Sequence, residues 1–290
     1  MILGGLLAVM GLVSLAYVVA LALAIRRNPA APRPEAIALG AVTNFFDALG
    51  IGCFAPTTAY LKFRRLVPDE LIAPTMMTGY ALASATEGFV FINAIQVDPL
   101  LLGLAIGASA LGAIAGVWVG GRLAVRPIRL TLGVGLLIAA ATFSLSNLGL
   151  MPAGGTATSL APVAFAVVVA ASFGLGILMN LGIGNFAPTL ILVSLLGMDP
   201  RAAFPIMMGS AALLMVTSGI RLVRVRPLDF GFVLGLTVGS VPAVLLAAFV
   251  VKSLPLAALR WGVVGVVTYA AALMLHAALT ERPTAAPASA

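Results

Sequence analysis

The segment Leu49-Gly50-Ile51-Gly52-Cys53-Phe54-Ala55-Pro56-Thr57 recurs as Leu181-Gly182-Ile183-Gly184-Asn185-Phe186-Ala187-Pro188-Thr189, and the two copies differ only at Cys53 and Asn185. Agreement this close does not arise by chance. Further matches keep an offset of about 131–132 residues: Pro74-Thr75-Met76-Met77 with Pro205-Ile206-Met207-Met208, and Gly88 with Gly219. The chain is therefore predicted to consist of two similar halves behind one leading helix.

The composition indicates an integral membrane protein. The 290 residues are 62% hydrophobic and only 9% charged, whereas soluble domains are about 45–50% apolar and about 25% charged. A soluble fold of this length could not hide so much apolar surface, because its own surface must be wetted. The net charge of +7 does not indicate nucleic-acid binding, since the basic residues lie in short clusters between apolar runs.

Apolar segments of roughly 20 residues or more recur along the chain, as membrane-spanning helices require. Arg26 and Arg27 follow the first of them rather than precede it, so we interpret it as a retained span and not as a signal peptide. The Pro/Ala-rich tail at 281–290 is expected to be disordered. The segments are 2–25, 36–61, 70–95, 99–121, 129–150, 162–197, 201–220, 228–251 and 257–279.

The basic clusters predict the topology. If segments 36–61 and 162–197 each enter and leave the membrane on one side, the clusters all fall in the cytoplasm, while Lys252 and Arg260 are left outside as exceptions. Each half then holds one re-entrant broken-helix hairpin and three spanning helices, so the halves are inverted repeats. We expect an all-α protein of the cell (inner) membrane with about seven spans and two hairpins. Its N-terminus is outside and its C-terminus is cytoplasmic. The clusters are 26–33, 62–65, 122–129 and 221–226.

This organisation forms one transmembrane domain without a soluble one. It comprises the leading helix and loop at 1–34, the first repeat at 35–150, the second repeat at 162–279 and the tail at 281–290.

The duplicated segment cannot run as an uninterrupted helix. Each glycine disfavours helix by about 1 kcal/mol relative to alanine, and the proline disfavours helix at the residue before it but suits the first turn of a new helix. We therefore predict that helix ends near Gly50 and Gly182 and restarts at Pro56 and Pro188. A restarting helix offers unpaired N–H groups and the positive end of its dipole, which together bind anions.

A small-anion site is therefore predicted where the two breaks meet at the midplane. Interrupted segments at matching positions of two halves are the best sequence pointer to a transport site. Asn44 and Asn180 flank the breaks and either donate to the substrate or cap the helix ends. The other predicted substrate-binding residues are Gly50, Gly52, Cys53, Thr57, Thr58, Gly182, Gly184, Asn185 and Thr189.

Two acidic residues lie inside apolar segments and are candidates for binding a coupling ion, H⁺ or Na⁺. Asp47 precedes the first break and Glu87 lies in segment 70–95, whereas Met179 and Ser218 stand at the corresponding positions of the second half. A carboxylate beside an anion site repels the substrate unless it is neutralised. The alternative is a protonated acid that only bonds to a neighbouring helix.

The hairpin from Asn44 to Ala55, and its second copy after Gly174-Leu175-Gly176, resemble the glycine-rich repeats of the sulfite exporter TauE/SafE family of membrane permeases. The resemblance covers the chain from about Glu35 to Leu279. It implies secondary transport of sulfite, organosulfonates or related sulfur oxyanions by alternating access, generally outward. Many members carry three glycines at the hairpin tip, and Cys53 and Asn185 replace the last of them here.

Other functional classes find little support in the sequence. A single Cys and a single His exclude an internal disulfide and any metal cluster built on these residues. We expect no cofactor, no metal and no enzymatic activity, because no nucleophile–base pair is apparent. The alternative function is a cation or other small-solute permease on the same fold, with Asp47 and Glu87 as ligands. The oligomeric state stays open, with a homodimer as one form.

Overall fold

The computed structural model describes residues 2–49, 52–119, 155, 157–179, 185–253 and 256–280, with scattered positions between 126 and 148. These residues are almost entirely helical, and within them the only β-type pairing is one isolated bridge between Ala157 and Met198. The predicted all-α class is therefore confirmed for the part of the chain that is described.

The helices follow the predicted apolar segments closely. In chain order they are α1 (Ile2–Arg27), α2 (Pro34–Ala48), α3 (Phe54–Arg64), α4 (Asp69–Gly79), α5 (Ala81–Ala94), α6 (Pro99–Val119), α8 (Pro162–Met179), α9 (Phe186–Leu195), η2 (Pro200–Ala202), α10 (Ala203–Val225), α11 (Phe230–Ser253) and α12 (Leu256–Thr280).

Five helical stretches are long and apolar enough to cross a bilayer, in agreement with the membrane protein that the composition predicts. They are Ile2–Arg27, Pro99–Gly116, Pro162–Met179, Pro200–Val225 and Phe230–Val250.

Two features differ from the predicted span list. Segment 70–95, expected to be one span, is divided at Tyr80 into α4 of 11 residues and α5 of 14 residues. Helix α8, expected to be one arm of a hairpin, is itself long enough to span. Segment 129–150 lies largely outside the described residues, so the total of seven spans stays a prediction.

The division at Tyr80 is stabilised from two other helices. The hydroxyl of Tyr17 on α1 donates to the carbonyl of Thr78 at 2.5 Å, and the hydroxyl of Thr237 on α11 donates to the carbonyl of Gly79 at 2.8 Å. A kink interrupts the regular ladder of backbone bonds, and bare carbonyls are costly in an apolar interior. The two hydroxyls donate hydrogen bonds to carbonyls at the kink, and these bonds lower the energetic cost of the irregular backbone there.

Two helix pairs carry the closest packing, and each joins one predicted half to the other. Helix α2 packs along α11, and α6 packs along α8. A Cβ atom added to Gly239 would lie 2.0 Å from the carbonyl oxygen of Ile37, and one added to Gly112 would lie 1.9 Å from that of Phe173. Glycine therefore lets both pairs of backbones approach closely, as in other membrane helix bundles.

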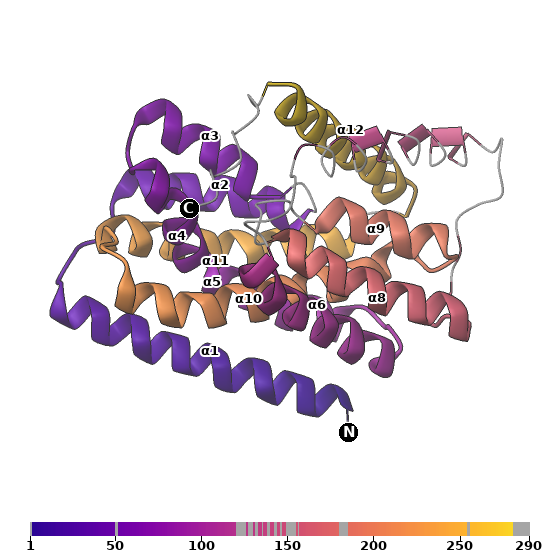
Figure 1. The fold of residues 1–290 in the computed structure, drawn as a ribbon, viewed down its shortest axis with the longest axis horizontal. Coiled ribbons are helices and arrows are strands. Elements are labelled where there is room, and N and C mark those ends of the chain that lie inside the picture. The colour runs from indigo at the N-terminus through magenta and orange to yellow at the C-terminus, as the bar shows by residue number, and fades with distance from the viewer. Residues whose placement is uncertain are drawn as a thin grey trace, which may run out of the picture.

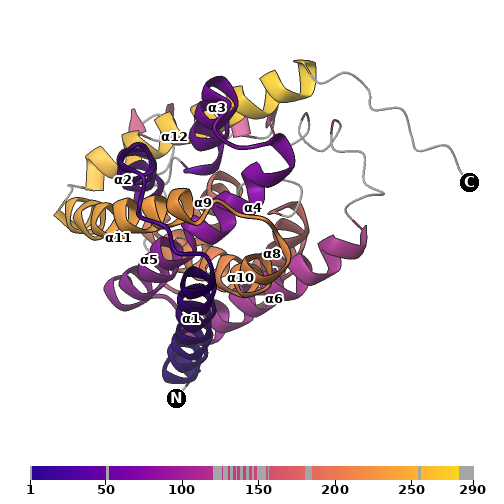
Figure 2. The same ribbon diagram turned by 90° about the vertical axis from the view of Figure 1, so that its left-hand side faces the viewer.

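The remaining helices complete the bundle around α10, which packs against α5, α1, α6 and α9. Figure 1 shows α1 along one outer edge and α12 along the opposite side, and Figure 2 shows the same two helices on opposite sides after the turn. The α2–α3 pair and the α8–α9 pair lie toward opposite ends of the long axis (Figure 1).

Candidate functional site

The first predicted chain break is present. Helix α2 ends at Ala48 and α3 begins at Phe54, so the chain restarts as helix two residues before Pro56 rather than at it. Pro56 is then the third residue of α3, within the first turn, where a missing N–H costs no intrahelical bond. Between the helices Gly52 has φ +87°, a conformation that glycine adopts at little cost.

The second predicted break lies at the matching place. Helix α8 ends at Met179 and α9 begins at Phe186, again two residues before the proline. The restart of the helix just before the proline is therefore confirmed in both copies, and residues 180–184, where the second helix is predicted to end, lie outside the described residues. Four predicted site residues lie outside the described residues: Gly50, Asn180, Gly182 and Gly184.

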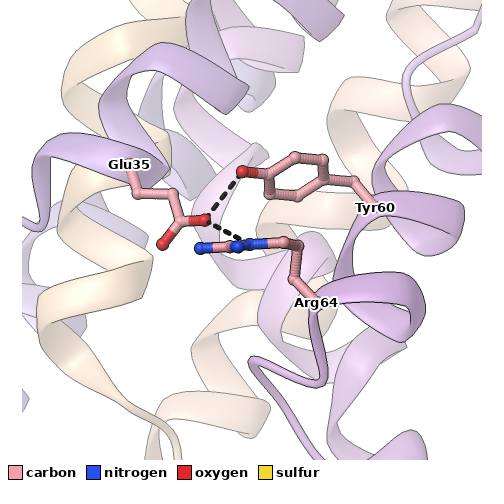
Figure 3. Close-up of polar contacts among 3 residues, drawn as sticks. All are labelled: Glu35, Tyr60 and Arg64. Atoms are coloured by element: carbon pink, nitrogen blue, oxygen red, sulfur yellow. Dashed lines mark hydrogen bonds and ion pairs between the residues drawn. The ribbon is translucent and has the colours of Figure 1, made fainter.

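Side chains hold the open ends of the first hairpin together. The carboxylate of Glu35, at the start of α2, accepts a hydrogen bond from the Tyr60 hydroxyl at 2.7 Å and one from Arg64 Nε at 3.2 Å (Figure 3). The Tyr60 bond first, and the Arg64 cation second, hold the pKa of this exposed carboxyl below its ordinary value. Since Arg64 ends α3, the chain leaves the hairpin at the same end of the bundle where it entered.

Backbone bonds hold the open ends of the second hairpin together. Ala157, which precedes α8, forms a bridge with Met198, which follows α9, and the N–H of Asp199 donates to the carbonyl of Ala157 at 3.0 Å. The second hairpin thus also returns to the end where it began.

The two hairpins open toward opposite ends of α11. Arg33, just before α2, forms an ion pair with Asp229, just before α11. Thr158 and Asp199, at the open end of the second hairpin, line a cavity with Leu245 and Phe249 from the last turns of α11. About 16–20 residues of helix, roughly 24–30 Å, separate the two ends.

At the first tip the chain supplies its own anionic group. Asp47 is 1% exposed, and its Oδ1 accepts a hydrogen bond from the N–H of Cys53 at 2.9 Å. The carbonyl of Cys53 in turn accepts from the N–H of Thr57 at 3.1 Å. The N–H groups of Cys53 and Thr57 therefore already have acceptors within the chain, a carboxylate and a carbonyl of the first helical turn.

A buried hydroxyl cluster lies beside this tip. The hydroxyl of Tyr80 lies 3.0 Å from that of Thr43 on α2 and 2.9 Å from that of Thr57 on α3, so one side chain at the kink joins both arms of the hairpin. Tyr80 and Thr43 were not among the predicted site residues. A tyrosine at the centre of an apolar segment was the available signal, because a buried phenol needs a polar partner.

Two predicted residues face other groups. The Thr58 hydroxyl bonds to the sulfur of Met76 at 3.5 Å, away from the Tyr80 cluster. Asn44 is fully buried within α2 and donates from Nδ2 to the carbonyl of Gly40 at 3.1 Å. Its Oδ1 is buried without a partner among the described residues. Asn44 therefore keeps an acceptor free near the first tip.

Glu87 is the most unusual polar group of the interior. It is 0% exposed on α5, and neither carboxylate oxygen has a hydrogen-bond partner within the described part of the chain. Burying an unpaired carboxylate in an apolar interior is very costly, and such a group holds a proton instead.

The second tip carries a different set of groups. Asn185 is 2% exposed, its carbonyl accepts from the N–H of Thr189 at 3.0 Å, and its Oδ1 has no partner among the residues that the structure describes. Thr189 is likewise buried. Met179 stands where Asp47 stands in the first half, so no carboxylate from that position reaches the start of α9.

The candidate site thus joins five of the predicted residues at the first tip, and it leaves Asn185 and Thr189 at the second. At the first tip, the buried Asp47 can take up and release a proton beside polar groups on a broken helix, and Glu87 on α5 is a second buried acid of the bundle. At the second tip, the first amides of α9 and the Asn185 side chain lie at the positive end of a helix dipole. The five residues at the first tip are Asn44, Asp47, Gly52, Cys53 and Thr57. The chain matches no protein-family model, no curated protein and no solved structure.

Proposed function

We propose that the chain is a secondary transporter that carries a small anion across the cell membrane by alternating access around the two hairpin tips, with protons as the coupling ion. The observation that carries the proposal is a pair of fully buried acids inside the apolar helices: Asp47 at the end of α2, next to the first break, and Glu87 on α5, whose carboxylate has no hydrogen-bond partner among the described residues. Ionisable residues inside a membrane protein mark ion or substrate pathways by default.

The helix arrangement supports an inverted-repeat transporter. Each hairpin returns to its own end, the two hairpins open toward opposite ends of α11, and the pairs α2–α11 and α6–α8 each join the two halves. Paired interrupted helices that meet near the membrane centre are the common plan of secondary transporters. The two predicted re-entrant hairpins fit this plan. So does the predicted orientation, with the N-terminus outside and the C-terminus inside.

An anionic substrate is supported by the helix starts at the breaks. The N–H groups of the first residues of α3 and α9 have no intrahelical acceptor and point toward the breaks. The carboxylate of Asp47 lies beside the start of α3 and bonds to the Cys53 amide. A negative charge there repels an anion, so we expect the anion to bind more readily when Asp47 and Glu87 are protonated. The resemblance to sulfite exporters makes sulfite or an organosulfonate the first substrate to test, and it implies export.

A cation permease is the second candidate, and one observation favours it. The buried polar residues of the described chain include two carboxylates, Asp47 and Glu87, but no lysine, arginine or histidine. Carboxylates and exposed carbonyls near broken helices are cation ligands in other transporters. A transport measurement decides between the two candidates.

The test is flux into proteoliposomes that contain the purified full-length chain. We expect labelled sulfite or a small organosulfonate to cross faster than in protein-free vesicles and to respond to an imposed pH gradient. Glu87→Gln should remove the response to the gradient, whereas the matched control Ser218→Ala, at the corresponding position of the second half, should retain it.

Other flux results would contradict the proposal. Transport of sodium or divalent cations without sulfur anions would favour the cation permease. A pH response that survives in Glu87→Gln would remove Glu87 from the coupling, and the absence of flux for every solute would remove the transporter function itself.

A further inference from the structure

The end of the molecule opposite the Glu35 contact holds a cavity of about 410 Å³. It lies where the C-terminal end of α5, the short helix η2 before α10 and the last turns of α11 meet the open end of the second hairpin. Its volume falls in the range of small-ligand pockets, about 300–1,000 Å³. None of its lining residues belongs to the hairpin tips.

The walls of this cavity are of two kinds. The apolar lining residues, here called the apolar wall, include Phe91, Ile95 and Phe249, and the polar ones, here called the polar wall, are Gln96, Thr158, Asp199 and Arg201. A site with this division suits a molecule with a charged head and an apolar body.

Arg201 is the basic group of the polar wall, and its guanidinium has no hydrogen bond or ion pair among the described residues. The backbone around it is fixed. The N–H of Arg201 donates to Asp199 Oδ1 at 2.8 Å, and the N–H of Asp199 donates to the carbonyl of Ala157 at 3.0 Å. One carboxylate oxygen of Asp199 therefore accepts a backbone hydrogen bond, and the N–H groups of the Arg201 guanidinium can donate to another partner.

From these observations we infer that the cavity binds an amphiphilic anion, with Arg201 paired to the anionic head and the Phe91–Phe249 wall covering a short apolar chain. A guanidinium forms bidentate bonds with sulfonate, carboxylate or phosphate oxygens. This site is separate from the hairpin tips. The inference rests on the proposed function in one respect, because it takes the anion to be a transported solute. The same chemistry occurs in the headgroup of an anionic lipid, so the test must separate the two sources.

Binding is measured by calorimetric titration of the purified full-length chain in an uncharged detergent. The probes are methanesulfonate, butanesulfonate, butylammonium and dihexanoylphosphatidylglycerol. We expect butanesulfonate to bind at least about tenfold more tightly than methanesulfonate, because each methylene that the apolar wall covers adds roughly fourfold. Butylammonium should not bind.

Arg201→Gln should weaken butanesulfonate binding by about tenfold or more, as expected for a lost charge-assisted hydrogen bond. The matched control is Arg221→Gln, which removes an exposed arginine at the other end of α10 and should leave binding unchanged. Arg201→Lys keeps the charge and should retain part of the affinity, which separates recognition of the anion from a general effect on folding.

Equal affinities of Arg201→Gln and Arg221→Gln, or binding of butylammonium as tightly as butanesulfonate, would overturn the inference. Binding of the phosphatidylglycerol that Arg201→Gln weakens, without binding of the sulfonates, would assign the site to lipid. If butanesulfonate binds but does not cross proteoliposome membranes, the proposed function fails while the binding site stands. If it crosses and Arg201→Gln binds butanesulfonate as tightly as the wild type does, the site fails while the transporter stands.

Discussion

The two hairpins share nearly the same nine-residue segment, yet different chemistry holds them in place. The first is closed at its open end by an exposed side-chain contact, Glu35 with Tyr60 and Arg64, and capped at its tip by Asp47. The second is closed by a backbone bridge and has no acidic residue at the position of Asp47. A duplicated backbone break therefore does not imply a duplicated function. The first tip suits proton binding and the second suits an uncharged donor or acceptor.

The strongest way to break this comparison is to remove the charge of Asp47. Asp47→Asn keeps an oxygen that can accept from the Cys53 amide, so the hairpin should fold, but it cannot exchange a proton. We expect pH-driven flux to fall by about 5–150-fold, the usual range of a coupling free energy. The control is Met179→Leu at the corresponding position, which should transport normally. Flux of Asp47→Asn close to wild type would show that the two tips do not differ in proton binding.

The packing of the two hairpins can be compared through glycine. Gly239→Ala forces a methyl group toward the Ile37 carbonyl in the α2–α11 pair, and Gly112→Ala does the same toward the Phe173 carbonyl in the α6–α8 pair. Each should destabilise the protein by about 1–3 kcal/mol or more, because backbone atoms cannot move aside easily. Gly107→Ala, with open space around it, is the control. Thermal unfolding in detergent measures all three, and a neutral effect in only one pair would show that the pairs are packed differently.

Exchanging the two tip residues sharpens the comparison further. Asn185→Cys removes the unpartnered Oδ1 of the second tip and should raise the half-saturating substrate concentration by about tenfold if this side chain contacts substrate. Cys53→Asn should have a smaller effect, because the Cys53 amide keeps its bond to Asp47. Initial rates at graded substrate concentrations provide the measurement. Equal effects of the two exchanges would argue against a substrate contact specific to Asn185.

The smallest expected effect concerns the open end of the first hairpin. The pKa of Glu35 lies below its ordinary value of 4.5, so its stabilising contribution is present above that pH and is lost as the pH falls through the lowered pKa. Glu35→Gln should slightly lower the melting temperature at neutral pH, and the difference from wild type should vanish in acid. Tyr60→Phe should remove most of the same difference, because the Tyr60 bond is the main cause of the shift. A difference that is independent of pH would mean that Glu35 acts through packing alone.

The sequence was sufficient to predict the two breaks because glycine and proline act locally. Steric limits on the backbone at Gly52 and the missing N–H of Pro56 operate within a few residues, so helix boundaries follow from the segment itself. The kink at Tyr80 was missed for the opposite reason. Gly79 and Pro74 lie close to it but do not form the glycine–proline pattern of the breaks, and the carbonyls at the kink are bonded by Tyr17 and Thr237, which are far away in sequence.

The sequence predicted which residues form the candidate site, but only some of the contacts between them. Asp47 and Glu87 were identified because acids are rare in apolar segments, but the bond from the Cys53 amide to Asp47 depends on how the loop between the helices folds back. Tyr80 was overlooked because its role comes from contacts with Thr43 and Thr57 on two other helices. Partners that are brought together only by packing leave no local signature.

The leading helix α1 links the two predicted halves of the chain. Tyr17 lies against Gly219 of the second predicted half and bonds to Thr78 of the first. Helix α1 therefore contacts both halves through one side chain. A fragment that begins after Arg27 would expose a polar carbonyl and an empty slot where this phenol fits. Co-expression of the separated halves should therefore rebuild the protein only when α1 remains attached or is supplied as a third piece.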